Sequence, residues 1–329
     1  MWSIVGHEWA VALLHRSLIQ DRVSHAYLIT GSPQIGKTTL ARTFSQALNC
    51  THPQASERPC QTCRSCELIK GNNHPDVRVI EPDGAYLKID QIRALQHQVA
   101  LSPVEGKWKI YILRQMERAT TEAANALLKT LEEPPAHAVL LLTAGEAEAL
   151  LPTIVSRCQP IPLRPLRRDL VEQALTKSWQ VQPEQASLLA RLSGGRLGWA
   201  IEAREKSSVL ELRGQRLDKL VELLKQGRAE RFAYAEKLSR DSDALREVMG
   251  LWLSWWRDLL LLAHNSKATL THQDRSPELH SLIKKLKPEQ ACQALKSIRA
   301  AIDSLDRHVN SRLAAEVLML NLPTLDTRI

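Results

Sequence analysis

The fold of the first half of the chain is decided by the stretch Ala26-Tyr27-Leu28-Ile29-Thr30-Gly31-Ser32-Pro33-Gln34-Ile35-Gly36-Lys37-Thr38-Thr39. Its first five residues form a short apolar run that predicts a buried strand, and residues 38–48 have the character of a helix. Between them lies the pattern G-x-x-x-x-G-K-[ST], in the strand–loop–helix context that this pattern requires. The stretch therefore predicts a phosphate-binding loop in an α/β domain.

The residue types of this loop indicate which ligand it binds. The glycines let main-chain N–H groups wrap around phosphate oxygens, and the N-terminus of the following helix adds partial positive charge. We expect Lys37 to bridge the β- and γ-phosphates and Thr38 to hold Mg²⁺. The predicted contacts for ATP with Mg²⁺ are Gly31, Gly36, Lys37, Thr38 and Thr39.

Segments that alternate between strand and helix follow this loop. Apolar runs at residues 77–80, 110–113 and 139–143 predict further strands, whereas residues 89–101 and 121–133 have helical spacing. Strands that alternate with helices of these lengths predict a parallel sheet flanked by helices.

The pattern changes after about residue 166, where strand signals end and helical stretches continue through the rest of the chain. We predict an α/β domain over residues 1–166, a small helical domain over residues 167–205 and a larger helical domain over residues 206–329.

A phosphate-binding loop that hydrolyses its nucleotide also needs an acidic residue at the end of a neighbouring strand, where it orients Mg²⁺. The strand predicted at residues 110–113 is followed by Arg114 and Gln115, and the nearest acid is Glu117, two residues further on. The sequence therefore supports nucleotide binding and argues against efficient hydrolysis.

Composition and charge indicate in which cellular compartment the protein is expected. The formal net charge of +8 suits either a surface that attracts nucleic acid or general solubility. Residues 1–5 lack the basic start and apolar core of a secretion signal. The most apolar run, residues 251–263, contains Ser254, Arg257 and Asp258 and is too short to span a bilayer. We expect a cytoplasmic protein without a membrane partner, whose thiols stay reduced.

Four cysteines lie close together in the first half of the chain. Cys50, Cys60, Cys63 and Cys66 have the spacing C-x9-C-x2-C-x2-C, and four thiolates within one short segment suit tetrahedral Zn²⁺. An iron–sulfur cluster and free thiols are the alternatives, and His74 is a candidate to replace one ligand. We predict a structural zinc site, because four protein ligands leave no open position for catalysis.

Three further stretches carry a family resemblance. His25-Ala26-Tyr27-Leu28 runs into the phosphate-binding loop, residues 124–135 read ANALLKTLEEPP, and Ser156-Arg157-Cys158 forms an S-R-C motif. Together with the inserted cysteine cluster, they resemble the clamp-loader family of bacterial DNA polymerase III, whose members are AAA+ proteins. The resemblance spans roughly residues 5–200. It implies an AAA+ domain, a small helical lid domain and an all-α collar domain that joins five subunits.

The same resemblance implies roles for two more residues. Thr143 lies at the position of the family's sensor 1 residue, and Arg157 at that of an arginine finger, which reaches the ATP bound by an adjacent subunit. It also implies the partners: other clamp-loader subunits in a heteropentamer, the sliding clamp through that complex, and primed DNA.

Two departures from the family pattern indicate which branch the chain is most similar to. Arg114 and Gln115 replace the acids of the family's motor subunits, and Gly198 lies where those subunits usually have the sensor 2 arginine. S-R-C is kept while the hydrolytic residues are lost, which resembles the delta-prime subunits. The alternatives are an active gamma/tau-like motor subunit that uses Glu117, and a separate zinc-containing DNA-binding module.

Overall fold

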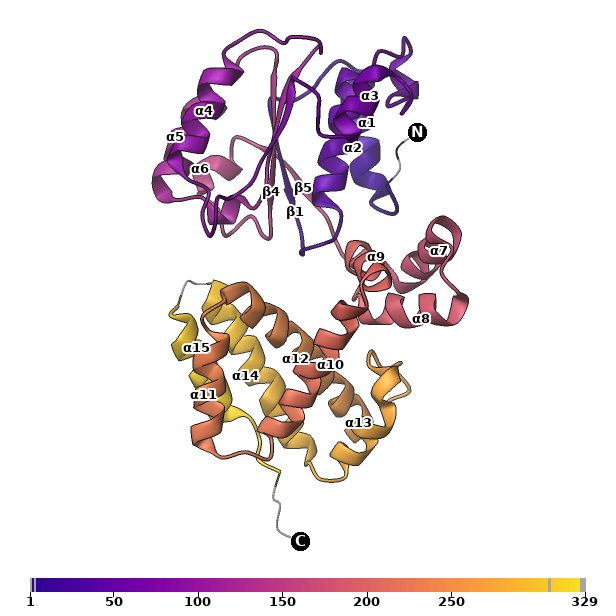
Figure 1. Ribbon diagram of the computed structural model, residues 1–329, viewed down its shortest axis with the longest axis vertical. Helices are drawn as coiled ribbons and strands as arrows, with labels where there is room; N and C mark the ends of the chain where they lie inside the picture. Colours follow the sequence, from indigo (N-terminus) through magenta and orange to yellow (C-terminus); the bar gives the residue numbers. More distant parts are fainter. Residues whose placement is uncertain (1, 3, 307–308, 326–329) are drawn as a thin grey trace. The chain divides into compact units, whose positions relative to one another are not determined.

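A computed structural model describes residues 2, 4–306 and 309–325 (Figure 1). The chain forms two compact units. The first comprises Met1–Val181 and Ser193–Trp199, and the second comprises Gln182–Leu192 and Ala200–Ile329. The predicted division into domains at residues 1–166, 167–205 and 206–329 remains a prediction.

The first unit is built on a five-stranded sheet in which every pairing is parallel, in the order β2-β3-β4-β1-β5. Its strands are β1 (Ala26–Thr30), β2 (Val77–Ile80), β3 (Lys109–Leu113), β4 (Ala138–Ala144) and β5 (Gln159–Pro162). The predicted parallel α/β architecture is confirmed. The fifth strand was not predicted, because Pro160 and Pro162 weaken its strand signal, but an edge strand tolerates proline.

Helices cover both faces of this sheet (Figure 1). On one side are α1 (Glu8–Ile19), α2 (Lys37–Asn49) and α3 (Arg64–Lys70), and on the other are α4 (Ile89–Val99), α5 (Thr121–Glu132) and α6 (Pro152–Val155). Successive strand residues point to opposite faces, so Leu28 joins the core beneath α4 and α5 while Ile29 joins the core beneath α1 and α2. The first unit also contains α7 (Arg168–Trp179).

The second unit is helical, and no strand follows Pro162 in the part of the chain that the structure describes. Its helices are α8 (Pro183–Leu192), the later part of α9 (Leu197–Glu205), α10 (Ser207–Leu223), α11 (Arg228–Leu238), α12 (Ser242–Ala263), α13 (Ser276–Ile283), α14 (Pro288–Asp306) and α15 (Ser311–Asn321). Trp252, Trp255 and Trp256 are fully buried at its core. No described helix is both long and apolar enough to span a membrane.

Arg231 of α11 is a buried cation that binds main-chain oxygens. Its Nε donates to the carbonyl of Leu223 at 2.9 Å, and its Nη atoms donate to three carbonyls near the end of α15. Those three carbonyls belong to Met319 (3.2 Å), Leu322 (2.8 Å) and Pro323 (2.8 Å). Burial lowers the pKa of Arg231, and the peptide dipoles satisfy its donors.

Candidate functional site

The loop after β1 has the backbone shape that a phosphate cradle needs. Gly31, Gln34 and Gly36 have positive φ angles of 142°, 61° and 111°. A Cβ at Gly31 would lie 2.6 Å from the carbonyl oxygen of Leu163, so no side chain fits there. The Gly31 N–H donates to the carbonyl of Gly145 at 2.9 Å, which fixes the start of the loop to the end of β4.

The helix that follows this loop presents an N-terminus suited to an anion. Gly36 is the N-cap of α2 and contributes no side-chain hydrogen bond, and the first turn contains no acidic residue. The first N–H groups of a helix lack partners within the helix and carry partial positive charge. Thr38 is half-buried and Thr39 is exposed at this end of α2. The residues present therefore fit a bound polyphosphate.

The Lys37 ammonium lies inside the loop. Its Nζ donates to the carbonyl oxygens of Gly31 and of Ser32, the latter at 3.0 Å. Burial lowers the pKa of Lys37, the Glu117 carboxylate raises it, and the Arg114 guanidinium lowers it. Lys37 is thus held where phosphate oxygens would replace the carbonyl oxygens as its acceptors.

The turn after β3 carries no acid at its first two positions. Arg114 forms an ion pair with Glu81 beyond the end of β2. Gln115 has a φ of 53°, and its N–H donates to Thr143 Oγ1 at 3.3 Å. Thr143 is buried in β4, so its hydroxyl fixes the turn in place. Glu117 is exposed, and its carboxylate acts electrostatically on Lys37.

Arg157 lies between α6 and β5 and is held by its own chain. Its Nη2 lies 2.8 Å from Glu132 Oε1 at the end of α5. Its Nη1 donates to the carbonyl of Thr153 at 2.9 Å and contacts Ser156 Oγ at 3.5 Å. The Arg157 side chain is 35% exposed, so it can be reached from outside the chain.

The four clustered cysteines come together around a single point. The Sγ atoms of Cys50, Cys60, Cys63 and Cys66 all lie within 4.8 Å of one another. Four thiolates at about 2.3 Å from one tetrahedral ion lie roughly 3.8 Å apart, so the cluster is compatible with Zn²⁺. His74 is engaged elsewhere: its Nε2 contacts Ser65 Oγ and its Nδ1 accepts from the Asp76 N–H, both at 3.1 Å.

The thiols of this cluster differ in their surroundings. Burial raises the pKa of Cys60, but N–H groups of Thr62 and Cys63 outweigh burial and bring it to about 6. Burial raises the pKa of Cys66 well above its ordinary value. A cation at the centre would favour the thiolate at every position.

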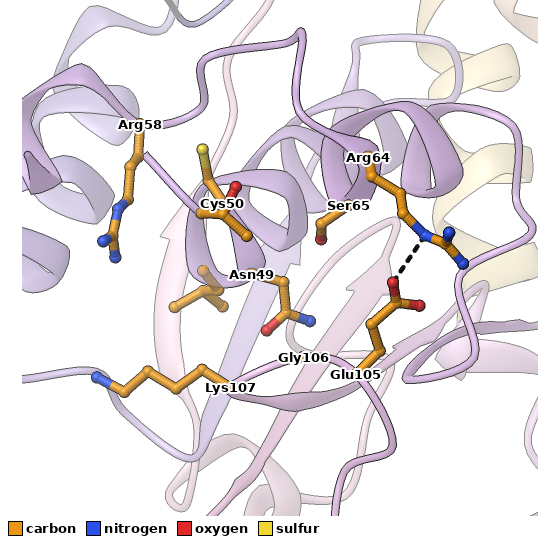
Figure 2. Close-up of a pocket in the computed structure, with 10 residues that line it drawn as sticks. Asn49, Cys50, Arg58, Arg64, Ser65, Glu105, Gly106 and Lys107 are labelled. Carbon is orange, nitrogen blue, oxygen red and sulfur yellow. Dashed lines mark ion pairs between the residues drawn. The ribbon is translucent and has the colours of Figure 1, made fainter. Parts of the chain in front are cut away.

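The segment that contains the four cysteines, residues 50–66, is called the cysteine module here, and it is attached to α2 and to the loop before β3. Cys50 follows directly on α2, and Gln46 Nε2 donates to the carbonyl of Cys66 at 2.8 Å. A pocket of about 310 Å³ lies beside Cys50, and the ion pair between Arg64 and Glu105, at 2.8 Å, crosses one side of it (Figure 2). This ion pair ties α3 to the loop that leads into β3.

A serine–histidine pair in the second unit resembles a hydrolytic dyad but cannot act as one. Ser254 Oγ lies 2.8 Å from His272 Nε2, and Arg213 Nη2 lies 2.6 Å from His272 Nδ1. Because a guanidinium only donates, Nδ1 accepts, and the imidazole proton sits on Nε2, facing the serine. The pKa of His272 is lowered to about 3 by burial and by Arg213, so the ring is not a base for Ser254.

Sequence reasoning missed two residues that contact the phosphate-binding loop. His7 precedes α1, and its Nε2 lies 3.3 Å from the carbonyl of Ile35. The N–H of Gly198, in the first turn of α9, donates to the carbonyl of Gln34 at 3.0 Å. Both contacts are made to main-chain atoms, so no pairing of residue types signals them. In the sequence, Gly198 is notable only because motor subunits usually have an arginine at this position.

The family models and the curated relatives that are similar to this chain are all described as subunits of DNA polymerase III. The family model described as "DNA polymerase III, delta subunit" matches residues 6–167, and "DNA polymerase III, delta subunit, C terminal" matches residues 208–324. The chain is 31% identical to DNA polymerase III subunit delta' of Bacillus subtilis over 94% of this chain and 93% of that protein. It is 36% identical to the tau subunit of the same organism, over 56% of this chain and 33% of that protein.

Among solved structures, a gamma subunit-related protein of DNA polymerase III from Thermotoga maritima is similar over 95% of this chain and 98% of that chain. The sequence identity is 20% and the TM-score 0.43. The match to the delta' relative extends over nearly the full length of both chains, whereas the match to the tau relative covers about half of this chain.

Proposed function

Because the chain belongs to the DNA polymerase III delta-prime subunit family, we propose that it is a clamp-loader subunit that binds ATP with Mg²⁺ and hydrolyses it poorly by itself. It works in the cytoplasm, at the replisome, within a heteropentamer of loader subunits. Through that complex it helps to place the sliding clamp on primed DNA. The match to a delta-prime relative over nearly its whole length supports this proposal over a tau-like role.

The observation that carries the proposal is the contrast between an intact phosphate-binding loop and a turn after β3 that has no acid at its first two positions. Lys37 and the N-terminus of α2 suit a triphosphate, whereas Arg114 occupies the end of β3 and pairs with Glu81. A guanidinium there cannot hold a divalent cation or accept a proton from an attacking water.

Each residue of the loop then has a role in binding. The N–H groups of the loop and of the first turn of α2 bind phosphate oxygens, Lys37 neutralises their charge, and Thr38 and Thr39 supply hydroxyls at the same helix end. The Thr38 hydroxyl would hold Mg²⁺, which would neutralise part of the phosphate charge. Thr143 holds the neighbouring turn and thereby fixes one wall of the site.

Arg157 serves a nucleotide held by the adjacent subunit in this proposal. Arg157→Ala is expected to leave assembly intact and to lower the ATPase rate of the reconstituted loader at least about tenfold, since arginine fingers stabilise transition-state charge strongly. Arg93→Ala, at an exposed arginine of α4 that also lies beside a carboxylate, is the matched control. An unchanged rate in the Arg157→Ala loader would remove the finger from the proposal.

The four thiolates hold a structural Zn²⁺ in this proposal. Four thiolates would complete a tetrahedral coordination and leave no position for water, so the module would stabilise the first unit and take no part in chemistry. Metal analysis of the purified protein should give one zinc and no iron for each chain. Iron and acid-labile sulfide in its place would favour a cluster.

One observation keeps an active motor subunit as a second candidate. The Glu117 carboxylate acts on Lys37, so an acid does lie near the phosphate site. Hydrolysis by the isolated chain at the rate of an assembled loader, lost in Glu117→Gln, would favour that candidate. Tight binding of the lone chain to primed DNA with a steep salt dependence would instead favour a DNA-binding module.

Co-purification tests the main proposal directly. The chain is expected to enter a heteropentamer with the other loader subunits, and that complex is then analysed for bound nucleotide and zinc. Failure to join the other subunits under conditions in which they assemble with a known delta-prime subunit would reject the proposal.

A further inference from the structure

Two residues from outside the phosphate-binding loop hold consecutive carbonyl groups on its outer side. The Gly198 N–H donates to the carbonyl of Gln34 at 3.0 Å, and His7 Nε2 lies 3.3 Å from the carbonyl of Ile35. All of these residues lie in the first unit. These two contacts therefore fix the orientation of two neighbouring peptide groups of the loop.

The planarity of the peptide bond converts these contacts into an orientation of the loop's donors. In a trans peptide the C=O and the N–H of one unit point in opposite directions. A Gln34 carbonyl that points to Gly198 turns the Ile35 N–H the other way, and an Ile35 carbonyl that points to His7 turns the Gly36 N–H away from His7. These are two of the N–H groups with which such a loop wraps phosphate.

Glycine is required at position 198 because of space. A Cβ there would lie 2.6 Å from the Gln34 carbonyl oxygen and 3.3 Å from its carbonyl carbon. A contact that short against backbone forces the first turn of α9 away from the loop. The Gly198 N–H is also one of the unpaired donors at the start of α9, so the contact satisfies the helix end.

His7 is held in a form that donates to the loop. It is buried before α1 with a φ of 57°, and burial lowers its pKa. The ring is therefore neutral, and because a carbonyl only accepts, its proton lies on Nε2. The imidazole acts here as a fixed hydrogen-bond donor.

We infer that Gly198 and His7 are positioning residues of the polyphosphate site, which aim the N–H groups of Ile35 and Gly36 at the bound phosphates. The inference rests on the proposed nucleotide binding. It predicts that introducing the arginine of motor subunits at position 198 weakens nucleotide binding, because the larger side chain breaks the contact with the loop.

The test uses the full chain, with Gly198→Ala, Gly198→Arg and His7→Phe measured against Gly250→Ala. Gly250 lies in α12, and a Cβ there meets nothing within 4 Å, which makes it a matched glycine control. ATP, ADP and pyrophosphate are expected to bind roughly three- to tenfold more weakly to the first three variants, as for the loss of about one hydrogen bond. Adenosine, which has no phosphate, should bind all four variants equally.

The outcomes separate this inference from the proposed function. If the wild-type chain binds ADP but Gly198→Arg binds it equally well or more tightly, the positioning role is wrong and the nucleotide site stands. If the wild-type chain binds neither ADP nor pyrophosphate, both are wrong. An equal loss for adenosine would show that the substitutions merely disturb the fold.

A second measurement needs no substitution. In the wild-type chain, amide resonances of Ile35 and Gly36 are expected to shift when pyrophosphate is added, while those of exposed loops elsewhere stay in place. Saturation with pyrophosphate without movement of these two resonances would contradict the inference even if every variant misfolds.

Discussion

The loop after β1 and the turn after β3 lie at the same edge of one sheet, with only β4 between them, yet they differ in what they retain. The loop has its glycines, its lysine and an uncapped helix end. The turn has an arginine bound to Glu81 where an acid would hold a metal ion. In the proposed function, binding a nucleotide and cleaving it depend on separate segments, so the second capacity can be lost while the first is kept.

The largest expected effect comes from removing the charge of the loop. Lys37→Ala should weaken ATP binding roughly 100-fold, because hydrogen bonds between charged groups contribute up to about 3 kcal/mol. Titration with a fluorescent ATP analogue measures this, with Lys129→Ala, at a lysine of α5, as the control. Equal affinities for the two variants would mean that the loop does not bind the triphosphate.

Acidic residues introduced into the turn after β3 should make ATP binding depend more strongly on Mg²⁺. In the double variant Arg114→Asp with Gln115→Glu, ATP affinity is expected to become about tenfold more dependent on Mg²⁺ than in the wild type. Calorimetry with Mg²⁺ and with a chelator measures the difference. Glu81→Gln, which frees Arg114 without adding an acid, is the control, and a wild-type dependence as large as that of the double variant would mean that another acid already serves the metal.

The pH dependence of binding sharpens the comparison further. Burial lowers the pKa of Lys37 below its ordinary 10.5, so the ammonium that phosphate needs is lost, and ATP affinity falls, at a lower pH than for an exposed lysine. Glu117 raises that pKa, so Glu117→Gln should move the fall to a still lower pH. Affinities measured from about pH 7 to about pH 10 test this shift. Identical profiles for variant and wild type would show that Glu117 does not act on Lys37.

The smallest effect on nucleotide binding is expected from the cysteine module. The 13 residues of α2 place Cys50 about 20 Å from the phosphate loop. Cys66→Ser should lose the metal and lower the thermal midpoint by about 4 °C or more, yet change ATP affinity by less than about twofold. Cys292→Ser, outside the module, should keep its metal. A large loss of affinity in Cys66→Ser would mean that the module supports the loop through α2.

The parallel sheet could be predicted because its strands and helices have clear periods. β1, β2, β3 and β4 each appear as an apolar run, and α2, α4 and α5 begin within one residue of their predicted starts. β5 could not be predicted, because its two prolines contradict a strand unless its place at the sheet edge is known. The helix α3 was not predicted, because Cys66 within it was interpreted only as a metal ligand.

Sequence patterns suggest candidate residues where side chains would carry the chemistry, and they give no sign of contacts that main-chain atoms make. Lys37 and the four cysteines are recognised by residue type and spacing, and the structure brings each set together. The Arg157–Glu132 ion pair, the link from Thr143 to Gln115 and the contacts to the outer side of the loop depend on the fold. Such contacts follow from geometry that a linear sequence does not contain.

The carbonyl acceptors of Arg231 fix an order of events during synthesis. The guanidinium emerges in α11, but three of its four acceptors lie 88 to 92 residues later, at and after the end of α15. Until those residues have been synthesised, the Arg231 guanidinium has only the Leu223 carbonyl of its four acceptors and otherwise binds water. The helical unit therefore completes its core only after α15 and the residues that directly follow it have been synthesised.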